Sequence, residues 1–147
     1  MKKLLSLVLL FLIGCSSPEP INIEMLIERD GVYYTKDTNQ PYSGPVFTLY
    51  EEKFGSGIKD EYTLVDGYID GSYKGYDTQG QLEFEGNMKD GSLDGTNKWY
   101  NGKGQLIKEK TYKDGKIIGI DKRYYDNGQL KEERTYKDGE IIDIKRY

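Results

Sequence analysis

The sequence of 147 residues contains no histidine, one cysteine, one tryptophan and only four prolines. The absence of histidine removes the commonest general base and metal ligand, and one cysteine cannot form an intramolecular disulfide or a cysteine-rich zinc site. Hydrophobic residues make up 36% of the chain, below the roughly 45–50% of ordinary globular domains. These deficits disfavour an enzyme and a thick closed core, and they favour an elongated or thin fold.

Acidic and basic residues are mixed along the whole chain. The 21 Lys plus Arg and 25 Asp plus Glu give a formal net charge of −4. The sequence contains no basic stripe able to neutralise a row of phosphates. We therefore predict that the protein has no nucleic-acid partner.

The first 14 residues have the composition of a bacterial signal peptide. Two lysines after Met1 precede an apolar run from Leu4 to Ile13, which is too short to span a bilayer. The run ends in Leu12-Ile13-Gly14-Cys15, which resembles the lipobox of bacterial lipoproteins. This resemblance implies cleavage before Cys15 and lipidation of its thiol. An ordinary leader followed by a stray cysteine is the alternative.

Residues 15–20 are predicted to be the lipidated cysteine and an extended tether, because Ser16 to Pro20 has a non-helical composition. Cleavage would remove two lysines and change the net charge from −4 to −6. A body of that charge is repelled by anionic headgroups, so acyl chains would provide the membrane attachment. The lipobox resemblance, with no aspartate after Cys15, implies the outer membrane or cell surface of a bacterium.

A period of 24 residues organises the rest of the chain. It spaces Gly-Gln-Leu triplets at 80–82, 104–106 and 128–130, and Asp-Gly pairs at 66–67, 90–91, 114–115 and 138–139. A degenerate copy occupies residues 44–67. We predict a signal peptide at 1–14, an N-terminal cap or incomplete repeat at 21–43, and repeats at 44–147.

Each unit is predicted to form two short antiparallel strands, because Asp-Gly supplies the positive φ angles of a tight hairpin turn. The expected fold is all-β: a single-layer meandering antiparallel sheet of stacked hairpins, with almost no helix after residue 20. Strict alternation would place Leu106 and Tyr112, six residues apart, on the same face of the sheet. It would do the same for Leu82 with Met88 and for Leu130 with Tyr136.

The residues that recur every 24 positions resemble the MORN repeat, in the bacterial variant found in YwqK-like antitoxins. The resemblance covers residues 25–143. Its carriers are Gly95 with Trp99-Tyr100, Gly119 with Tyr124-Tyr125, Asn127 to Leu130, and Tyr136 to Gly139. The resemblance implies a sheet in which each hairpin stacks on the next. It also implies an antitoxin or immunity role, in which the body binds and neutralises a toxin.

No catalytic residue, metal or cofactor is predicted. The regular carboxylates Asp30, Asp66, Asp90, Asp114 and Asp138 each precede glycine in a predicted turn, which explains them without catalysis. An Asp-Gly-x-x-Asp-Gly pattern begins at Asp66 and again at Asp90 and offers oxygen ligands. It lacks the denser carboxylates of a calcium loop.

Tyr73, Trp99 and Tyr125 are the candidate partner-binding residues. Tyrosine and tryptophan are enriched at protein interfaces, where they offer rigid contact area. Tyrosines that recur every 24 residues are explained by packing between hairpins; they are Tyr76, Tyr100 and Tyr124, and Tyr112 and Tyr136. Tyr73, Trp99 and Tyr125 stand where the repeat does not require an aromatic residue.

The sequence thus predicts a non-enzymatic, membrane-anchored repeat protein whose sheet binds another protein. The alternative is a surface or envelope protein that binds glycan or host material, with Trp99 and Tyr125 as the discriminating residues. A partner that adds a strand would instead dock at the C-terminal strand, from Ile141 to Tyr147.

Overall fold

A computed structural model describes residues 18–147 of the chain, so the predicted signal peptide and lipidation site Cys15 lie outside the described residues. The described part contains no α-helix, only the 3₁₀ turns η1 (Ile23–Met25) and η2 (Glu52–Phe54). None of the helical segments described could cross a membrane. The prediction of an all-β fold is confirmed.

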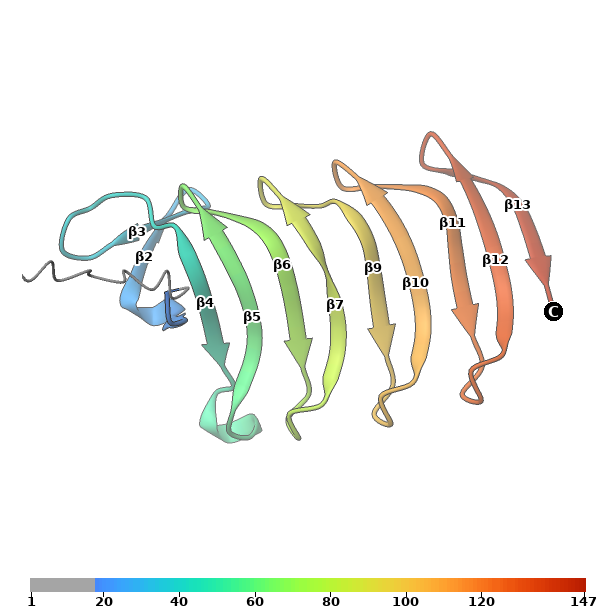
Figure 1. Cartoon of the computed structure of the whole chain (residues 1–147), viewed down its shortest axis with the longest axis horizontal. Coiled ribbons are helices and arrows are strands. Elements are labelled where there is room, and N and C mark those ends of the chain that lie inside the picture. Colours follow the sequence, from blue (N-terminus) through green and yellow to red (C-terminus); the bar gives the residue numbers. More distant parts are fainter. Residues whose placement is uncertain (1–17) are drawn as a thin grey trace, which may run out of the picture.

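One 11-stranded sheet forms most of the molecule (Figure 1). Its strands are β1 (Ile21–Asn22), β4 (Gly44–Leu49), β5 (Ile58–Val65), β6 (Tyr68–Tyr76), β7 (Leu82–Lys89), β8 (Ser92–Leu93), β9 (Gly95–Tyr100), β10 (Leu106–Lys113), β11 (Lys116–Tyr124), β12 (Leu130–Lys137) and β13 (Glu140–Arg146). From β4 to β13 they lie side by side in chain order, apart from β8, which pairs only with β7. Every pair is antiparallel except β1 with β4. The predicted meander is therefore correct.

The Asp-Gly pairs form the hairpin turns, as the sequence predicts. Asp114 and Gly115 have φ angles of 49° and 75°, and a type I′ turn requires positive φ at both central residues. The pairs that begin at residues 30, 66, 90 and 138 share this conformation. Local turn chemistry therefore sets where the strands reverse at one end of the sheet.

The prediction that Leu106 and Tyr112 share a face is wrong. A register shift between Leu106 and Lys108 places Leu106 opposite Tyr100, whereas Tyr112 lies opposite Gly95. Tyr100 and Gly95 are five residues apart in one strand and so point to opposite faces. Equivalent shifts occur where β6 pairs with β7 and where β11 pairs with β12. The same correction therefore applies to Leu82 with Met88 and to Leu130 with Tyr136.

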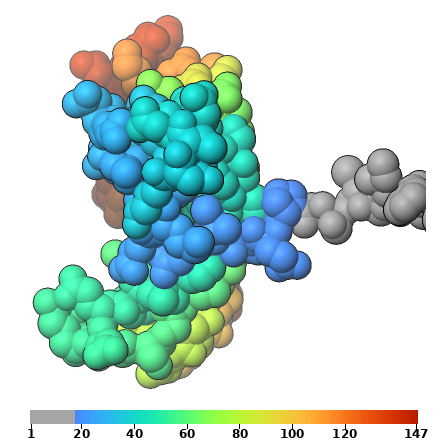
Figure 2. All heavy atoms as spheres, turned by 90° about the vertical axis from the view of Figure 1, so that its left-hand side faces the viewer, coloured from blue at the N-terminus to red at the C-terminus, as the bar shows by residue number. Residues whose placement is uncertain are grey.

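The small apolar core lies at the N-terminal end of the sheet. Leu26 of the separate hairpin β2 (Leu26–Arg29) and β3 (Val32–Thr35) packs with Val46, Tyr62 and Leu64 of β4 and β5. Figure 2, which looks along the sheet from this end, shows the N-terminal segment on one side of the strands. The segment thus covers one face of the first two long strands. Tyr73 on β6 lies at the border of this core.

Candidate functional site

Acidic and basic residues alternate across one face of the sheet, which we call the uniform face. Strand registers place them in a single row: Glu61, Lys74, Glu85, Lys98, Glu109, Lys122, Glu133 and Lys145. Lys98 Nζ lies 3.7 Å from Glu85 Oε1, and Lys122 Nζ lies 3.7 Å from Glu109 Oε1. The four glutamates recur every 24 residues, so each hairpin presents the same charges to its neighbour.

Repeated tyrosines support this row. Tyr76 donates a 2.7 Å hydrogen bond to Glu61, and Tyr100 donates a 2.6 Å hydrogen bond to Glu85. Burial raises the pKa of Tyr76 and of Tyr100 to about 12, and the hydrogen bond to the adjacent carboxylate acts in the same direction. Each of these tyrosines therefore links its own strand to a glutamate on the preceding long strand of the sheet. Their role here is structural, as the repeated column predicts.

This arrangement predicts a loss of stability in alkaline solution. The folded state raises the pKa of Tyr100 from 10.0 to about 12. A raised pKa contributes stability that is complete below the unfolded pKa and is lost as pH rises through the folded pKa. We expect the free energy of unfolding, measured with urea, to fall between about pH 10 and 12. The free energy of unfolding of the Tyr100→Phe variant should fall less steeply over the same pH range.

Glu85→Gln provides the control for this prediction, because it keeps Tyr100 and removes the carboxylate that accepts its hydrogen bond. Its stability should also depend less on pH than that of the natural protein. Equal slopes in all three proteins would contradict the assignment.

The opposite face behaves differently, and we call it the variable face. At the middle of its strands, matching positions of successive units hold different residues. The four sets are Asp60, Phe84, Lys108 and Glu132; Tyr62, Gly86, Lys110 and Arg134; Tyr73, Asn97 and Asp121; and Gly75, Trp99 and Arg123. The two faces belong to the same strands. The repeated backbone therefore does not by itself require the residues of the variable face to differ from unit to unit.

Aromatic rings form the N-terminal part of the variable face. Tyr62 stacks on Tyr73 with ring centroids 5.6 Å apart, and Phe84 lies 5.4 Å from Tyr73 and 5.1 Å from Trp99. Tyr73 also donates a 2.7 Å hydrogen bond to Asp60, and its pKa is raised, chiefly by burial. The structure thus joins the predicted residues Tyr73 and Trp99 in one row across four strands.

A close approach of two strands lies beside the aromatic row. Asn97 is fully buried, and its side-chain amide donates to the Gly95 carbonyl at 3.0 Å. Its Oδ1 would lie 1.9 Å from a Cβ atom added to Gly86. Gly86 therefore has no room for a side chain, because Asn97 fills that place.

Cationic side chains form the C-terminal part of the variable face. Lys108 Nζ lies 4.1 Å from the Trp99 ring centroid, within the range of a cation–π interaction. Burial, and then repulsion by Lys110, lower the pKa of Lys108. Lys108 pairs in register with Arg123 of the next strand. The aromatic row is therefore directly adjacent to a group of charged side chains.

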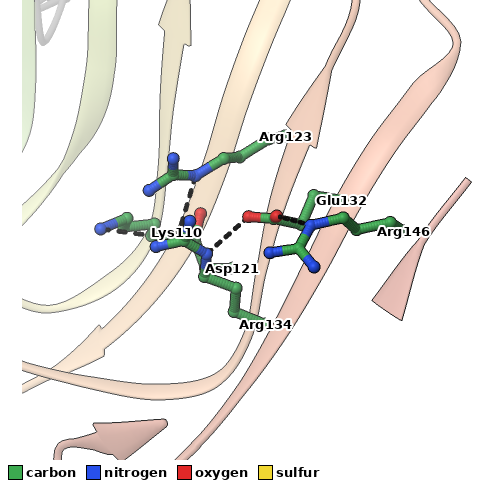
Figure 3. A network of polar contacts seen from close by, with 6 residues as sticks. All are labelled: Lys110, Asp121, Arg123, Glu132, Arg134 and Arg146. Carbon is green, nitrogen blue, oxygen red and sulfur yellow. Dashed lines mark hydrogen bonds and ion pairs between the residues drawn. The ribbon is translucent and has the colours of Figure 1, made fainter. Parts of the chain in front are cut away.

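Two carboxylates hold that network together (Figure 3). Asp121 Oδ2 lies 3.6 Å from both Lys110 Nζ and Arg123 Nε. The Glu132 carboxylate accepts hydrogen bonds from Arg134 and Arg146, at 2.6 and 2.9 Å. The bond from Arg134, together with the nearby positive charge, lowers the pKa of Glu132.

Tyr125 does not join this surface. It lies 43% exposed in the loop between β11 and β12, with Lys131 Nζ 5.3 Å from its ring centroid. Tyr125 occupies the loop position of Asp77 and Asn101, whose side chains accept backbone N–H groups in the preceding units. The structure therefore separates Tyr125 from Tyr73 and Trp99.

Sequence reasoning missed the remaining members of the variable face. They are Phe84, Lys108, Lys110, Asp121, Arg123, Glu132, Arg134 and Arg146. A comparison of matching positions in successive units could have found these residues. Their positions hold different residues from unit to unit, whereas the glutamates and lysines of the uniform face recur. Within residues 18–147 we find no group of three or more acidic or cysteine side chains placed to hold a metal ion.

Comparison with known proteins assigns the hairpins to a repeat family. Residues 69–90, 93–114 and 119–138 match the MORN repeat variant. These segments contain β6 and β7, β9 and β10, and most of β11 with β12. A search of curated proteins gave no match. The stretch from residue 69 to 138 is therefore similar to an array of MORN repeat variants.

Proposed function

We propose that this chain is a non-enzymatic protein-binding module that contacts its partner through the variable face. One observation carries the proposal: at the middle of the strands, successive units repeat the same glutamate and lysine row on one face and differ on the other. Modules of MORN repeats generally bind proteins. Because the repeated ion-pair row of hairpin stacking lies on the uniform face, the side chains that differ on the variable face are available for recognition.

The dimensions and residue types of the variable face support this proposal. From β6 to β13 the sheet extends over six strand spacings, or about 29 Å, which suits a protein interface of ordinary size. Trp99 and Phe84 provide aromatic side chains, and the strands that follow provide arginines on the same face (Figure 3). Tryptophan, tyrosine and arginine are the residues that most often dominate binding energy.

The proposal includes membrane attachment through a lipid on Cys15, at the outer membrane or cell surface of a bacterium. Its support is the sequence of the first 20 residues. Residues 21–43 would act as the cap and residues 44–147 as the repeats. The YwqK-like resemblance supports a toxin as the partner, which the module would bind and neutralise.

A second candidate function is the binding of glycan or host material. Tyr125 favours it, because its exposed ring lies in a shallow hollow together with Asp126, Asn127 and Lys131. An exposed ring beside polar side chains suits a sugar.

Replacement of Trp99 separates the two functions. We expect Trp99→Ala to weaken capture of the native protein partner by about tenfold or more. Tyr125→Ala should leave capture unchanged. The measurement is cross-linking of the tagged full-length protein in its native cell, followed by quantitative mass spectrometry. Circular dichroism should first confirm that both variants are folded.

The opposite pattern would contradict the proposal. Unchanged capture by Trp99→Ala, with loss of polysaccharide binding in Tyr125→Ala, would assign function to the β11–β12 loop. It would favour the glycan-binding alternative.

A further inference from the structure

The C-terminal part of the variable face carries an excess of positive charge. Strands β10 to β13 contribute five cations and two carboxylates to its central rows, an excess of three positive charges. The cations are Lys108, Lys110, Arg123, Arg134 and Arg146, and the carboxylates are Asp121 and Glu132. The chain as a whole has a formal net charge of −4. We call this cluster the cationic patch.

The internal carboxylates do not neutralise the cationic patch. Asp121 is fully buried and shares its single charge between Lys110 and Arg123, at 3.6 Å each. Its two oxygens and Arg123 Nε have no hydrogen-bond partner among the described residues. Lys108 makes no ion pair with any described carboxylate. The patch therefore retains an excess of positive charge, including the Lys108 ammonium, for an external anion.

The cationic patch is a strip that runs across the strands. Together with the adjoining Trp99 on β9, it extends to Arg146 on β13 over four strand spacings, or about 19 Å, the length of about six residues of extended chain. Phe84 and Trp99 form an apolar surface at one end of it. A ligand that matches the strip has negative charges along its length and an apolar group at one end.

We propose that the cationic patch binds an extended acidic segment of the partner protein, with an apolar side chain of that segment against Trp99. This inference rests on the proposed protein-binding function. Two or three carboxylates match an excess of three positive charges. The adjoining aromatic rings suit a peptide, which combines carboxylates and apolar side chains in one chain. A phosphate backbone carries more negative charge than the patch could balance.

Trp99 provides a built-in reporter, because it is the only tryptophan of the chain and lies at the edge of the patch. The probe is a six-residue peptide with three glutamates, one leucine and no aromatic residue. We expect a saturable change in the Trp99 fluorescence of the full chain. Binding of the same peptide with glutamine in place of glutamate should be about tenfold weaker or absent. High salt should weaken binding of the acidic peptide.

Two adjacent residues of β11 provide a matched pair of variants. Arg123 lies on the variable face and Lys122 on the uniform face. Their side chains are 39% and 38% exposed, and their ion-pair distances are 3.6 and 3.7 Å. Arg123→Gln should bind the acidic peptide about fivefold more weakly, and Lys122→Gln should bind it like the natural protein. Circular dichroism checks folding. Lys108→Gln against Lys98→Gln repeats the comparison with a lysine of the variable face that has no ion pair and a lysine of the uniform face that pairs with Glu85.

Three results would overturn the inference. The first is the absence of a fluorescence response to the acidic peptide. The second is equal weakening by Arg123→Gln and Lys122→Gln, which would indicate non-specific attraction. The third is tighter, Arg123-dependent binding of single-stranded DNA or of vesicles containing anionic phospholipid, because it would assign the patch to another class of ligand.

Capture of the native partner separates this inference from the proposed function. If capture depends on Trp99 but is unchanged in Arg123→Gln, the acidic-segment inference fails and the protein-binding function stands. If no protein is captured in the cell although the acidic peptide binds at Arg123, the proposed function fails.

Discussion

Asp121→Ala is expected to lower the free energy of unfolding by about 3 kcal/mol, because removal of one member of a buried ion pair leaves its partners uncompensated. Asp121 has no exposed surface, and two cations lie 3.6 Å from its carboxylate. Without it, Lys110 and Arg123 would repel each other across adjacent strands. The variant should unfold at a clearly lower urea concentration.

Glu109→Ala is the control for this measurement. Glu109 forms an ion pair of almost the same length, 3.7 Å, with Lys122, but its side chain is 25% exposed on the uniform face. Ion pairs in contact with solvent usually contribute less than about 1 kcal/mol. If Glu109→Ala and Asp121→Ala lower the free energy of unfolding equally, burial does not explain the contribution of Asp121 to stability.

Gly86→Ala should reduce the free energy of unfolding by about 2 kcal/mol, the usual effect of forcing extra atoms into a packed site. The added Cβ would lie 1.9 Å from Asn97 Oδ1, and this buried side chain has no open space to enter. Either the two strands separate or Asn97 adopts a less favourable conformation. Urea denaturation measures the cost.

Two further variants test whether contact with Asn97 causes the loss. Gly75→Ala lies on the same face, and the nearest atom to its added Cβ is 3.5 Å away, so it should be tolerated. In the double variant Gly86→Ala with Asn97→Ala, the cost of the alanine at position 86 should largely disappear. A full, additive loss in the double variant would contradict the explanation.

The hairpins could be predicted from the sequence because turn chemistry is local. An Asp-Gly pair such as Asp114-Gly115 specifies a type I′ turn almost alone, and the 24-residue period gives the number of residues between turns. The faces of the strands could not be predicted as well. The register shift that places Leu106 opposite Tyr100 arises from pairing with a neighbouring strand, and no residue in that segment predicts the shift.

The candidate site was only partly visible for a similar reason. Tyr73 and Trp99 stand out because they break the repeated columns, and the structure joins them through Phe84. The cationic patch does not correspond to a basic run in the sequence, since its five cations come from four strands between residues 108 and 146. Only the strand registers bring these side chains together.

The alternating charges of the uniform face make the hairpins interchangeable. Every glutamate of the row meets a lysine on the next strand, so the contact between two units is the same wherever it occurs. Gene duplication of one 24-residue unit would thus lengthen the sheet by two strands, about 10 Å, with the charges of the uniform face matched at both junctions. Evolution can extend this row of charges and change side chains of the variable face separately, because the two sets lie on opposite sides of the same strands.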